Sequence, residues 1–444
     1  MSANPYLSGN FGPVTDELTA FDLRVTGTIP RELRGRLLRN GPNPVVAPDP
    51  AKYHWFTGNG MVHGLRLRDG RAEWYRNRFV RDDEVAAARG LPLAPGPRHG
   101  MGSGVANTNV IRHAGRTFAI VEAGGLPVEL SDELETIGYS DFEGTLPGSF
   151  TAHPKRDPDT GELHAVVYYW EWDYLQYVVV ARDGRVRKTV NVPVPGKPMV
   201  HDCAITENYV VLFDLPCTFD VNVAMEGAFP YVWNPDYGAR VGLLPREGDA
   251  SQVRWLEVPL CYVFHPMNAY EAADGQVVME VCRHPKMFDR DRLGPNEGRP
   301  TLDRWVLDPS SGKVSTECLD DRGHEFPRHD ERRLGKSIRY GYTAGLADHL
   351  GVGPIYKHDL ATRTSQVRIE GNGRAYLEPV FVPRTPTSGE DDGWLLAYVY
   401  DAPTNGGEVQ ILHAQDFTGS PVATIHLPQR VPFGFHGNWV PDAQ

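Results

Sequence analysis

The sequence predicts an all-β fold, and three observations lead to this prediction. Short apolar or alternating runs recur along all 444 residues, each bounded by turn-forming residues. Glycine and proline are frequent, with 46 and 37 residues spread over the whole chain. Helix signals are few, and we expect one short helix over 83–90, ended by Gly90. Many short strands without helical crossovers indicate a sandwich, a barrel or a propeller, and at this length a propeller of about six to eight four-stranded blades fits best.

The strands are expected to pair as hairpins in chain order. The first hairpin joins 62–67 to 71–80 through the turn Asp69-Gly70. The second joins 109–112 to 117–122, and the third joins 164–170 to a long strand over 174–186 that contains Asp183-Gly184. Later runs predict strands over 207–214, 253–258, 263–271, 276–282, 302–307, 353–357, 366–370, 394–400, 408–412 and 422–427.

The segment 216–238 differs from the rest because it is rich in aromatic residues and only weakly periodic. It is typical of a packed loop that covers one face of the propeller. The alternative is an apolar entrance for a substrate, or a patch that contacts a membrane surface.

Composition excludes several classes of protein. The net charge is -12, from 45 Lys and Arg against 57 Asp and Glu, which disfavours nucleic-acid binding. The five cysteines form no CxxC pair, so we expect reduced thiols and a cytoplasmic protein. We expect neither a signal peptide nor a transmembrane helix, and peripheral membrane contact stays open. We expect one domain over 1–444, with 1–20 as an N-terminal extension and no obligatory protein partner.

Four of the sixteen histidines lie in apolar, strand-like surroundings: His153, His201, His265 and His436. Buried imidazoles need partners, and four neutral imidazoles can share one divalent metal ion. Three more lie in mixed strands and are expected to be structural: His63, His284 and His426. The other nine lie near turns or charged residues and are expected to be exposed: His54, His99, His113, His164, His324, His329, His349, His358 and His413.

The ligand type limits the identity of this metal. Imidazole suits zinc, copper, iron or nickel, and an all-histidine set with open positions suits ferrous iron and dioxygen. Histidine ligands need acceptors for their second N–H group, usually carboxylates. Glu122, Glu325 and Glu378 stand in apolar surroundings and are the candidates, with a salt bridge to a nearby arginine as the alternative for each.

From near Phe21 to its C-terminus the sequence resembles the carotenoid cleavage oxygenase family. The resemblance is carried by Leu-Arg-Asn-Gly-Pro-Asn-Pro at 38–44, Gly-Asn-Gly-Met-Val-His-Gly at 58–64, Ala-Asn-Thr-Asn-Val at 106–110 and the segments around the four histidines. It implies a seven-bladed β-propeller with loops and short helices capping one face over an axial metal site. It further implies one iron(II) per chain, held by His153, His201, His265 and His436.

The resemblance also implies roles for residues around the metal. Glu122 would hold His201, Glu325 would hold His265 and Glu378 would hold His436, which leaves His153 without a carboxylate. Thr108 matches a threonine whose methyl group lies close to an open coordination position. The implied reaction inserts dioxygen across an alkene C=C bond and gives aldehyde or ketone products.

The substrate is predicted from two departures and one tunnel residue. The family often has Asp-Gly-Asp-Gly-Met where this chain has Thr-Gly-Asn-Gly-Met at 57–61, which concerns a local polar network and not the metal. Relatives that cleave hydroxystilbenes or phenylpropenoids tend to carry a lysine where this chain has Val121. We therefore expect a carotenoid or apocarotenoid, with a stilbene or phenylpropenoid aryl-alkene as the alternative. Phe264 is expected either in the tunnel wall or in ordinary core packing.

Other interpretations of the histidines stay open. The chain could be a non-oxidative isomerase-like relative, or a binding or scaffold propeller whose histidines are structural. A metal-dependent lactonase propeller fits less well, because axial carboxylates and asparagine would be expected there in place of four histidines.

Overall fold

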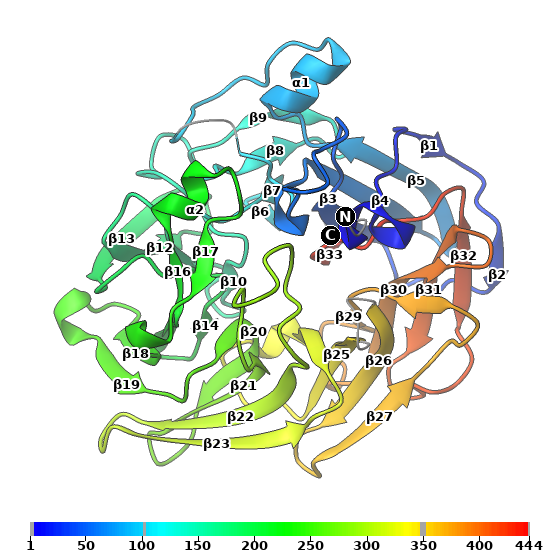
Figure 1. Cartoon of the computed structure of the whole chain (residues 1–444). Coiled ribbons are helices and arrows are strands. Elements are labelled where there is room, and N and C mark those ends of the chain that lie inside the picture. Colours follow the sequence, from blue (N-terminus) through cyan, green and yellow to red (C-terminus); the bar gives the residue numbers. More distant parts are fainter. Residues whose placement is uncertain (1–3, 101–103, 347–351, 443–444) are drawn as a thin grey trace.

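Seven main sheets surround a central axis in the computed structural model, which describes residues 4–100, 104–346 and 352–442. Each sheet is one blade, and the blades follow one another round the ring in chain order (Figure 1). The seven-bladed propeller implied by the resemblance is therefore confirmed.

The first four blades are built from strands of the N-terminal part of the chain, and the first blade also contains the last strand of the chain. The first blade is β1 (Thr19–Ala20), β5 (Arg71–Phe79), β4 (Gly60–Arg68), β3 (Gly35–Pro42) and β33 (Gly437–Pro441). The second is β6 (Asn109–His113), β7 (Arg116–Ile120), β8 (Val128–Leu130) and β9 (Thr136–Tyr139), and the third is β10 (Lys155–Arg156), β11 (Leu163–Val167), β12 (Tyr174–Val180) and β13 (Val186–Pro193). The fourth is β14 (Ala204–Ile205), β15 (Tyr209–Asp214), β18 (Arg240–Pro245) and β19 (Arg254–Glu257).

The remaining three blades follow the same antiparallel pattern. The fifth is β20 (Tyr262–Glu271), β21 (Val277–His284), β22 (Thr301–Asp308) and β23 (Lys313–Asp320). The sixth is β24 (His324–His329), β25 (Tyr340–Leu346), β26 (Val352–Asp359) and β27 (Thr364–Arg368). The seventh is β28 (Arg374–Tyr376), β29 (Val380–Pro383), β30 (Gly393–Asp401), β31 (Gly406–His413), β32 (Ala423–Leu427) and β2 (Val25–Gly27).

The ring is closed by pairing between the two ends of the chain. β33 runs antiparallel to β3, with Gly35 opposite Pro441 and Arg39 opposite Gly437. β2 likewise pairs with β32 in the last blade. Closure in this way leaves the segment before β33, which carries His436, at the centre of the propeller (Figure 1).

Apolar side chains fill the space between neighbouring blades. One buried cluster joins Val179 of β12, Val211 of β15 and Val277 of β21, from three successive blades. Blades packed face to face in this way bury apolar surface on both sides. The inner ends of the blades are thus fixed, and residues at the start of inner strands can be placed accurately on the axis.

The predicted hairpins are largely confirmed, with one correction. The turn Asp69-Gly70 joins β4 to β5, and both residues have the positive φ, 52° and 77°, that such a turn needs. The long strand expected over 174–186 is wrong, because Asp183-Gly184 is itself a turn between β12 and β13. Gly184, with φ 91°, ends one strand and lets the chain reverse.

Short helices lie outside the sheets. The expected helix is α1 (Asp83–Arg89), where Asp82 caps the N-terminus by accepting from Val85 N and Gly90 follows with φ 64°. The other elements are α2 (Val221–Met225) and the 3₁₀ turns η1 (Pro5–Leu7), η2 (Gly9–Phe11), η3 (Trp55–Thr57), η4 (Pro235–Tyr237), η5 (Ala250–Gln252) and η6 (Glu331–Arg333). None of the helices in the described residues is long and apolar enough to cross a membrane.

The aromatic segment 216–238 forms a small layer of its own. β16 (Cys217–Phe219) pairs with β17 (Tyr231–Trp233), and α2 connects the two strands. Phe229 and Tyr231 of this segment line the large apolar cavity described below, while Met225 on α2 is 83% exposed. The segment therefore contributes to a cavity wall and also presents apolar surface outward.

Candidate metal centre

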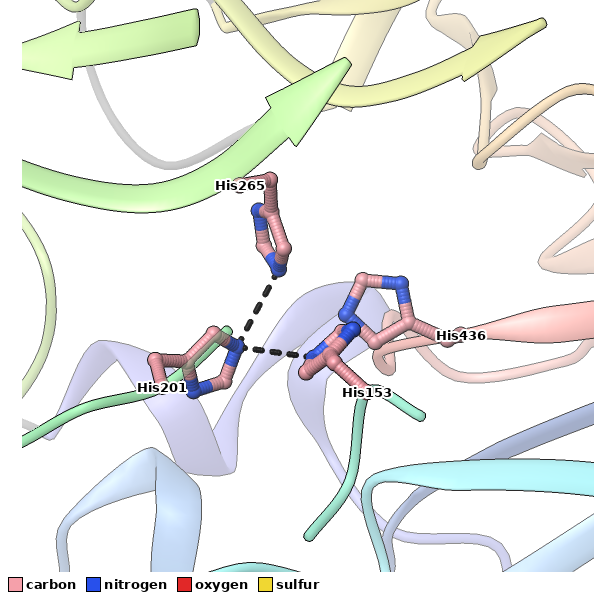
Figure 2. Close-up of side chains that lie close together, drawn as sticks. All are labelled: His153, His201, His265 and His436. Atoms are coloured by element: carbon pink, nitrogen blue, oxygen red, sulfur yellow. Dashed lines mark hydrogen bonds between the residues drawn. The ribbon is translucent and has the colours of Figure 1, made fainter. Parts of the chain in front are cut away.

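Four buried histidines converge on one point at the axis of the propeller (Figure 2). Nε2 of His201 lies 3.0 Å from Nε2 of His153 and 3.1 Å from Nε2 of His265. The ligand atoms of these three residues and His436 all lie within 4.8 Å of one another. The structure thus brings together the four histidines selected from the sequence, and we refer to them as the histidine cage.

Each ligand stands at the inner end of a blade. His153 lies two residues before the short inner strand β10, His201 lies three residues before β14, and His436 directly precedes β33. His265 lies within β20, where the register shifts between Val263 and Pro266. A proline and a bulge are tolerated there because β20 is the edge strand of its sheet.

Three of the four rings have a glutamate at Nδ1. Glu325 Oε2 lies 2.5 Å from Nδ1 of His265, and Glu378 Oε1 accepts from Nδ1 of His436 at 2.9 Å. Glu122 Oε2 lies 2.6 Å from Nδ1 of His201, at an angle outside that of a regular hydrogen bond. An acceptor at Nδ1 turns Nε2 toward the centre of the cage and fixes the ring orientation.

Two of the glutamates, Glu325 and Glu378, are themselves held by further groups, which the sequence did not reveal. His284 Nε2 lies 2.7 Å from Glu325, so this structural histidine supports a ligand from behind. Arg328 lies 3.4 Å from Glu378 and also donates to the carbonyl of Gly437 at 3.1 Å. These partners come from neighbouring blades, and no short sequence motif links them.

Electrostatics favour neutral rings surrounded by charged carboxylates. Burial lowers the pKa of His436 to about 3 and that of His153 well below its usual value, so both keep a free nitrogen lone pair at neutral pH. Burial alone would raise the pKa of Glu378, but Arg328 and His436 lower it to about 2. His265 is the exception, because Glu325 outweighs burial and raises its pKa.

The cage can hold a divalent transition-metal ion. Imidazole nitrogens bind such ions at about 2.1 Å, so neighbouring ligands at right angles lie about 3.0 Å apart. The measured separations of 3.0 and 3.1 Å have this size. The set contains no thiolate and no direct carboxylate ligand, so no ligand would neutralise the double charge of the ion. Glu122, Glu325 and Glu378, which lie at the outer nitrogens of the rings, would balance that charge instead.

A cavity of about 480 Å³ adjoins the cage. Its walls include His201, His265 and His436, together with Thr108, Val121 and Glu122. Among the described residues that line it there is no lysine or arginine. Its lining also includes the aromatic residues Trp55, Phe56, Phe229, Phe264, Phe326 and Phe435. This size and lining suit an apolar ligand.

The other residues selected from the sequence also lie at this cavity. Phe264 packs edge-on against His201, with ring centroids 5.1 Å apart, and it lines the cavity as well as the core. Thr108 is buried, donates its hydroxyl to Asn107 Oδ1 at 2.9 Å and accepts the backbone N–H of His436 at 3.0 Å. Thr108 is thus tied directly to a ligand segment.

A second cavity, of about 650 Å³, reaches the cage from the side of His153. It is lined by charged groups that include Lys155, Asp202, Arg328 and Glu378. His201 borders the first cavity and His153 the second, whereas His265 and His436 border both. The cage therefore separates an aromatic cavity from a charged one.

The expectation that turn-proximal histidines are exposed is wrong: six are buried and two, His99 and His413, are half-buried. The buried ones are His54, His113, His164, His324, His329 and His358. His349 lies outside the described residues. The buried rings find polar partners on other strands; His164, for example, lies between the Tyr177 hydroxyl at 2.7 Å and the Arg246 guanidinium at 2.7 Å. Satisfied in this way, a histidine needs no metal to be buried.

Comparison with known proteins places the chain in a family. The family model described as retinal pigment epithelial membrane protein (RPE65) matches residues 11–441. The chain belongs to this RPE65/carotenoid oxygenase family. The match covers all seven blades, so the resemblance noted from short motifs extends over the whole fold.

Three similar proteins have oxygenase names. A carotenoid cleavage oxygenase of Mycobacterium tuberculosis is 48% identical and covers 99% of this chain and 98% of its own. Isoeugenol monooxygenase of Pseudomonas nitroreducens is 34% identical, with 99% and 98% covered. The crystal structure of Pseudomonas brassicacearum lignostilbene dioxygenase has a TM-score of 0.88 at 29% identity, with 99% and 98% covered. Members of the RPE65/carotenoid oxygenase family thus include proteins named for polyene and for aryl-alkene substrates.

Proposed function

We propose that the chain is a non-haem iron(II) dioxygenase that cleaves a C=C bond of a carotenoid or apocarotenoid and gives aldehyde or ketone products. The observation that carries the proposal is the histidine cage at the wall of an aromatic cavity without lysine or arginine among its described lining residues. Iron(II), when bound, would supply the activation of dioxygen. The reaction balances without any proton donor, because both oxygen atoms end in the two carbonyl groups.

The residues of the chain have three tasks in this proposal. The four histidines bind the metal through Nε2, and Glu122, Glu325 and Glu378 hold their rings. Aromatic walls that include Phe264 orient an extended apolar chain and exclude water from the alkene. Thr108, fixed to His436 through its carbonyl, would shape the open space beside the cage.

The preference for a polyene comes from the charge of the cavity. Val121 lies in the lining directly before Glu122, where a lysine would meet a phenol. A phenolate carried into this cavity would find no cation among the described lining residues, and burial of an unpaired charge is unfavourable.

An aryl-alkene is the second candidate, and one observation favours it. Tyr168 and Tyr231 both line the cavity, and their rings lie edge to face with centroids 5.9 Å apart. A neutral phenol could join this pair as donor or acceptor without a lysine. The isoeugenol and lignostilbene enzymes named above show that such substrates occur in similar proteins.

A competition experiment tests the proposal. The chain is loaded with iron(II), freed of excess metal, and incubated in air with an apocarotenal and a hydroxystilbene together, and the products are identified by LC–MS. We expect aldehydes from the polyene, and none with His265→Ala, which should also lose bound iron. Cleavage of the stilbene alone would establish the second candidate, and one iron per chain in His265→Ala would refute the ligand set.

A further inference from the structure

His153 differs from the other three ligands in its surroundings. The carboxylate nearest to its Nδ1 is Asp202, at 3.8 Å, which is too long for a direct hydrogen bond. The side chain of Asp202 is only 2% exposed, and its Oδ1 accepts the backbone N–H of Cys203 at 2.6 Å. Lys155 Nζ lies 2.8 Å from both of its carboxylate oxygens. A carboxylate buried to this degree needs such a partner.

This ion pair joins two ligand segments of different blades. Asp202 directly follows His201, and Lys155 lies two residues after His153. The Nε2 atoms of these two histidines are 3.0 Å apart, slightly closer than the 3.1 Å between Nε2 of His201 and Nε2 of His265. Another polar contact between the segments, from Cys203 Sγ to the carbonyl of His153, is long at 4.0 Å. The ion pair is therefore the strong polar tie between them.

The same arrangement recurs around two of the other ligands, His265 and His436. Glu325 is anchored by His284 at 2.7 Å, and Glu378 is anchored by Arg328 at 3.4 Å. In each case a carboxylate faces Nδ1 of a ligand while a second side chain holds the carboxylate. Asp202 and Lys155 repeat this pairing at His153, with a longer distance to the ring.

We propose that the Lys155–Asp202 ion pair is a positioning pair, which places His153 against His201 and thereby sets the metal affinity of the cage. The inference rests on the proposed metal site. Asp202 acts on His153 through its negative charge, and Lys155 fixes the position of the Asp202 carboxylate. Because Lys155 and Asp202 border the charged cavity, the pair acts from the side away from the aromatic cavity.

The test measures cobalt(II) binding rather than turnover. Affinity is determined by competition with a chelator, and the ligand-field absorption spectrum reports the ligand geometry. We expect Asp202→Asn and Lys155→Met each to weaken binding about 10- to 100-fold and to shift the spectrum. The double variant should be no weaker than the worse single variant, because the two side chains act as a unit. Lys155→Arg should recover most of the affinity and the parental spectrum.

The chain offers a matched control pair. Lys357 and Asp391 are also 2.8 Å apart, with side chains 8% and 18% exposed, against 17% and 2% for Lys155 and Asp202. Neither residue borders the cage or its two cavities. Lys357→Met should lower the unfolding temperature and leave the cobalt affinity and spectrum unchanged.

The outcomes separate the inference from the proposal beneath it. If the parent binds one cobalt(II) and the two single variants bind within about twofold of it, the positioning role is refuted. If Lys357→Met weakens cobalt(II) binding to the same extent, the positioning role is also refuted, because the loss of affinity would then follow from lower stability in general. A parent that binds no cobalt(II) would refute the metal site itself. If Asp202→Asn does not fold, Asp202→Glu keeps the charge but moves it, and an unshifted spectrum there would again refute the role.

Discussion

Replacement of Glu378 by glutamine should lower the free energy of unfolding of the metal-free chain by about 3 kcal/mol at pH 7. The buried carboxylate accepts from His436 Nδ1 at 2.9 Å and Gly437 N at 2.8 Å, with Arg328 beside it. Burial alone would raise the pKa of this carboxyl group, but Arg328 and His436 lower it from 4.5 to about 2. That lowering corresponds to about 3 kcal/mol of stabilisation. Glutamine keeps the size and one acceptor oxygen, but it removes the charge and puts an NH₂ group in place of the other acceptor, opposite His436 Nδ1 or Gly437 N.

Urea unfolding in the presence of a chelator, at pH 7 and pH 4, measures this effect. Because the folded-state pKa lies below the unfolded value, the stabilisation is complete above about pH 5 and is lost as the pH falls toward about 2. The difference between parent and variant should therefore shrink by about 1 kcal/mol between pH 7 and pH 4. Equal urea midpoints at pH 7, or a difference that does not shrink, would refute the reasoning.

Glu280→Gln is the control for the sign of this effect. Glu280 is fully buried beside Arg304, at 2.7 Å, but burial outweighs the arginine and raises its pKa. Its ionised form is therefore disfavoured in the folded chain, and the parent loses stability relative to this variant as the pH rises. The difference between parent and variant should change with pH in the direction opposite to that of Glu378→Gln.

Three further predictions concern the cavity and the surface. Val121→Lys should raise the ratio of stilbene to apocarotenal products about tenfold in the LC–MS competition, since a charged hydrogen bond to a phenol contributes about 1.5–3 kcal/mol; an unchanged ratio would remove the argument from Val121. Phe264→Ala should keep one metal ion per chain but lower the free energy of unfolding by about 3 kcal/mol. Metal analysis and urea midpoints measure these two quantities, and loss of the metal ion would show that Phe264 supports the histidine cage itself. Met225→Glu on α2 should reduce co-sedimentation with lipid vesicles, whereas Ile369→Glu, at a residue 69% exposed and remote in sequence, should not; equal effects would exclude α2 as the contact.

The four histidines could be selected from the sequence because their neighbours are apolar or small. Phe264 and Pro266 flank His265, and Phe435 and Gly437 flank His436, which leaves little chance of solvation. The hairpins could also be predicted from the sequence, since alternation of apolar and polar residues and an Asp-Gly turn are local signals. The turn at Asp183-Gly184 was missed because the apolar residues Val178–Val180 and Val186 on its two sides favour a single strand, even though Asp-Gly is itself a turn signal.

Long-range partners could not be predicted in this way. His164 is buried by Arg246, 82 residues away in the sequence, and Glu378 is anchored by Arg328, 50 residues away. Turn-proximal position therefore does not imply exposure when the next blade covers the turn. The role of Asp202 could not be predicted from its neighbours in the sequence, because its proximity to Lys155 depends on how the third and fourth blades meet at the axis.

The division of the molecule at the cage accounts for the placement of charge. The carboxylates that would compensate the charge of a dication lie at Nδ1, on the outer side of the rings, and two of them, Glu122 and Glu325, also border the first cavity. Glu122, Glu325 and Glu378 lie at Nδ1 of three rings, and the charged cavity adds Asp202 behind the fourth. In the proposed reaction, neutral rings with carboxylates at their outer nitrogens would let one site combine a charged metal ion with an apolar chain. Removal of a carboxylate should therefore impair metal binding more than substrate binding, whereas changes in the aromatic wall should do the reverse.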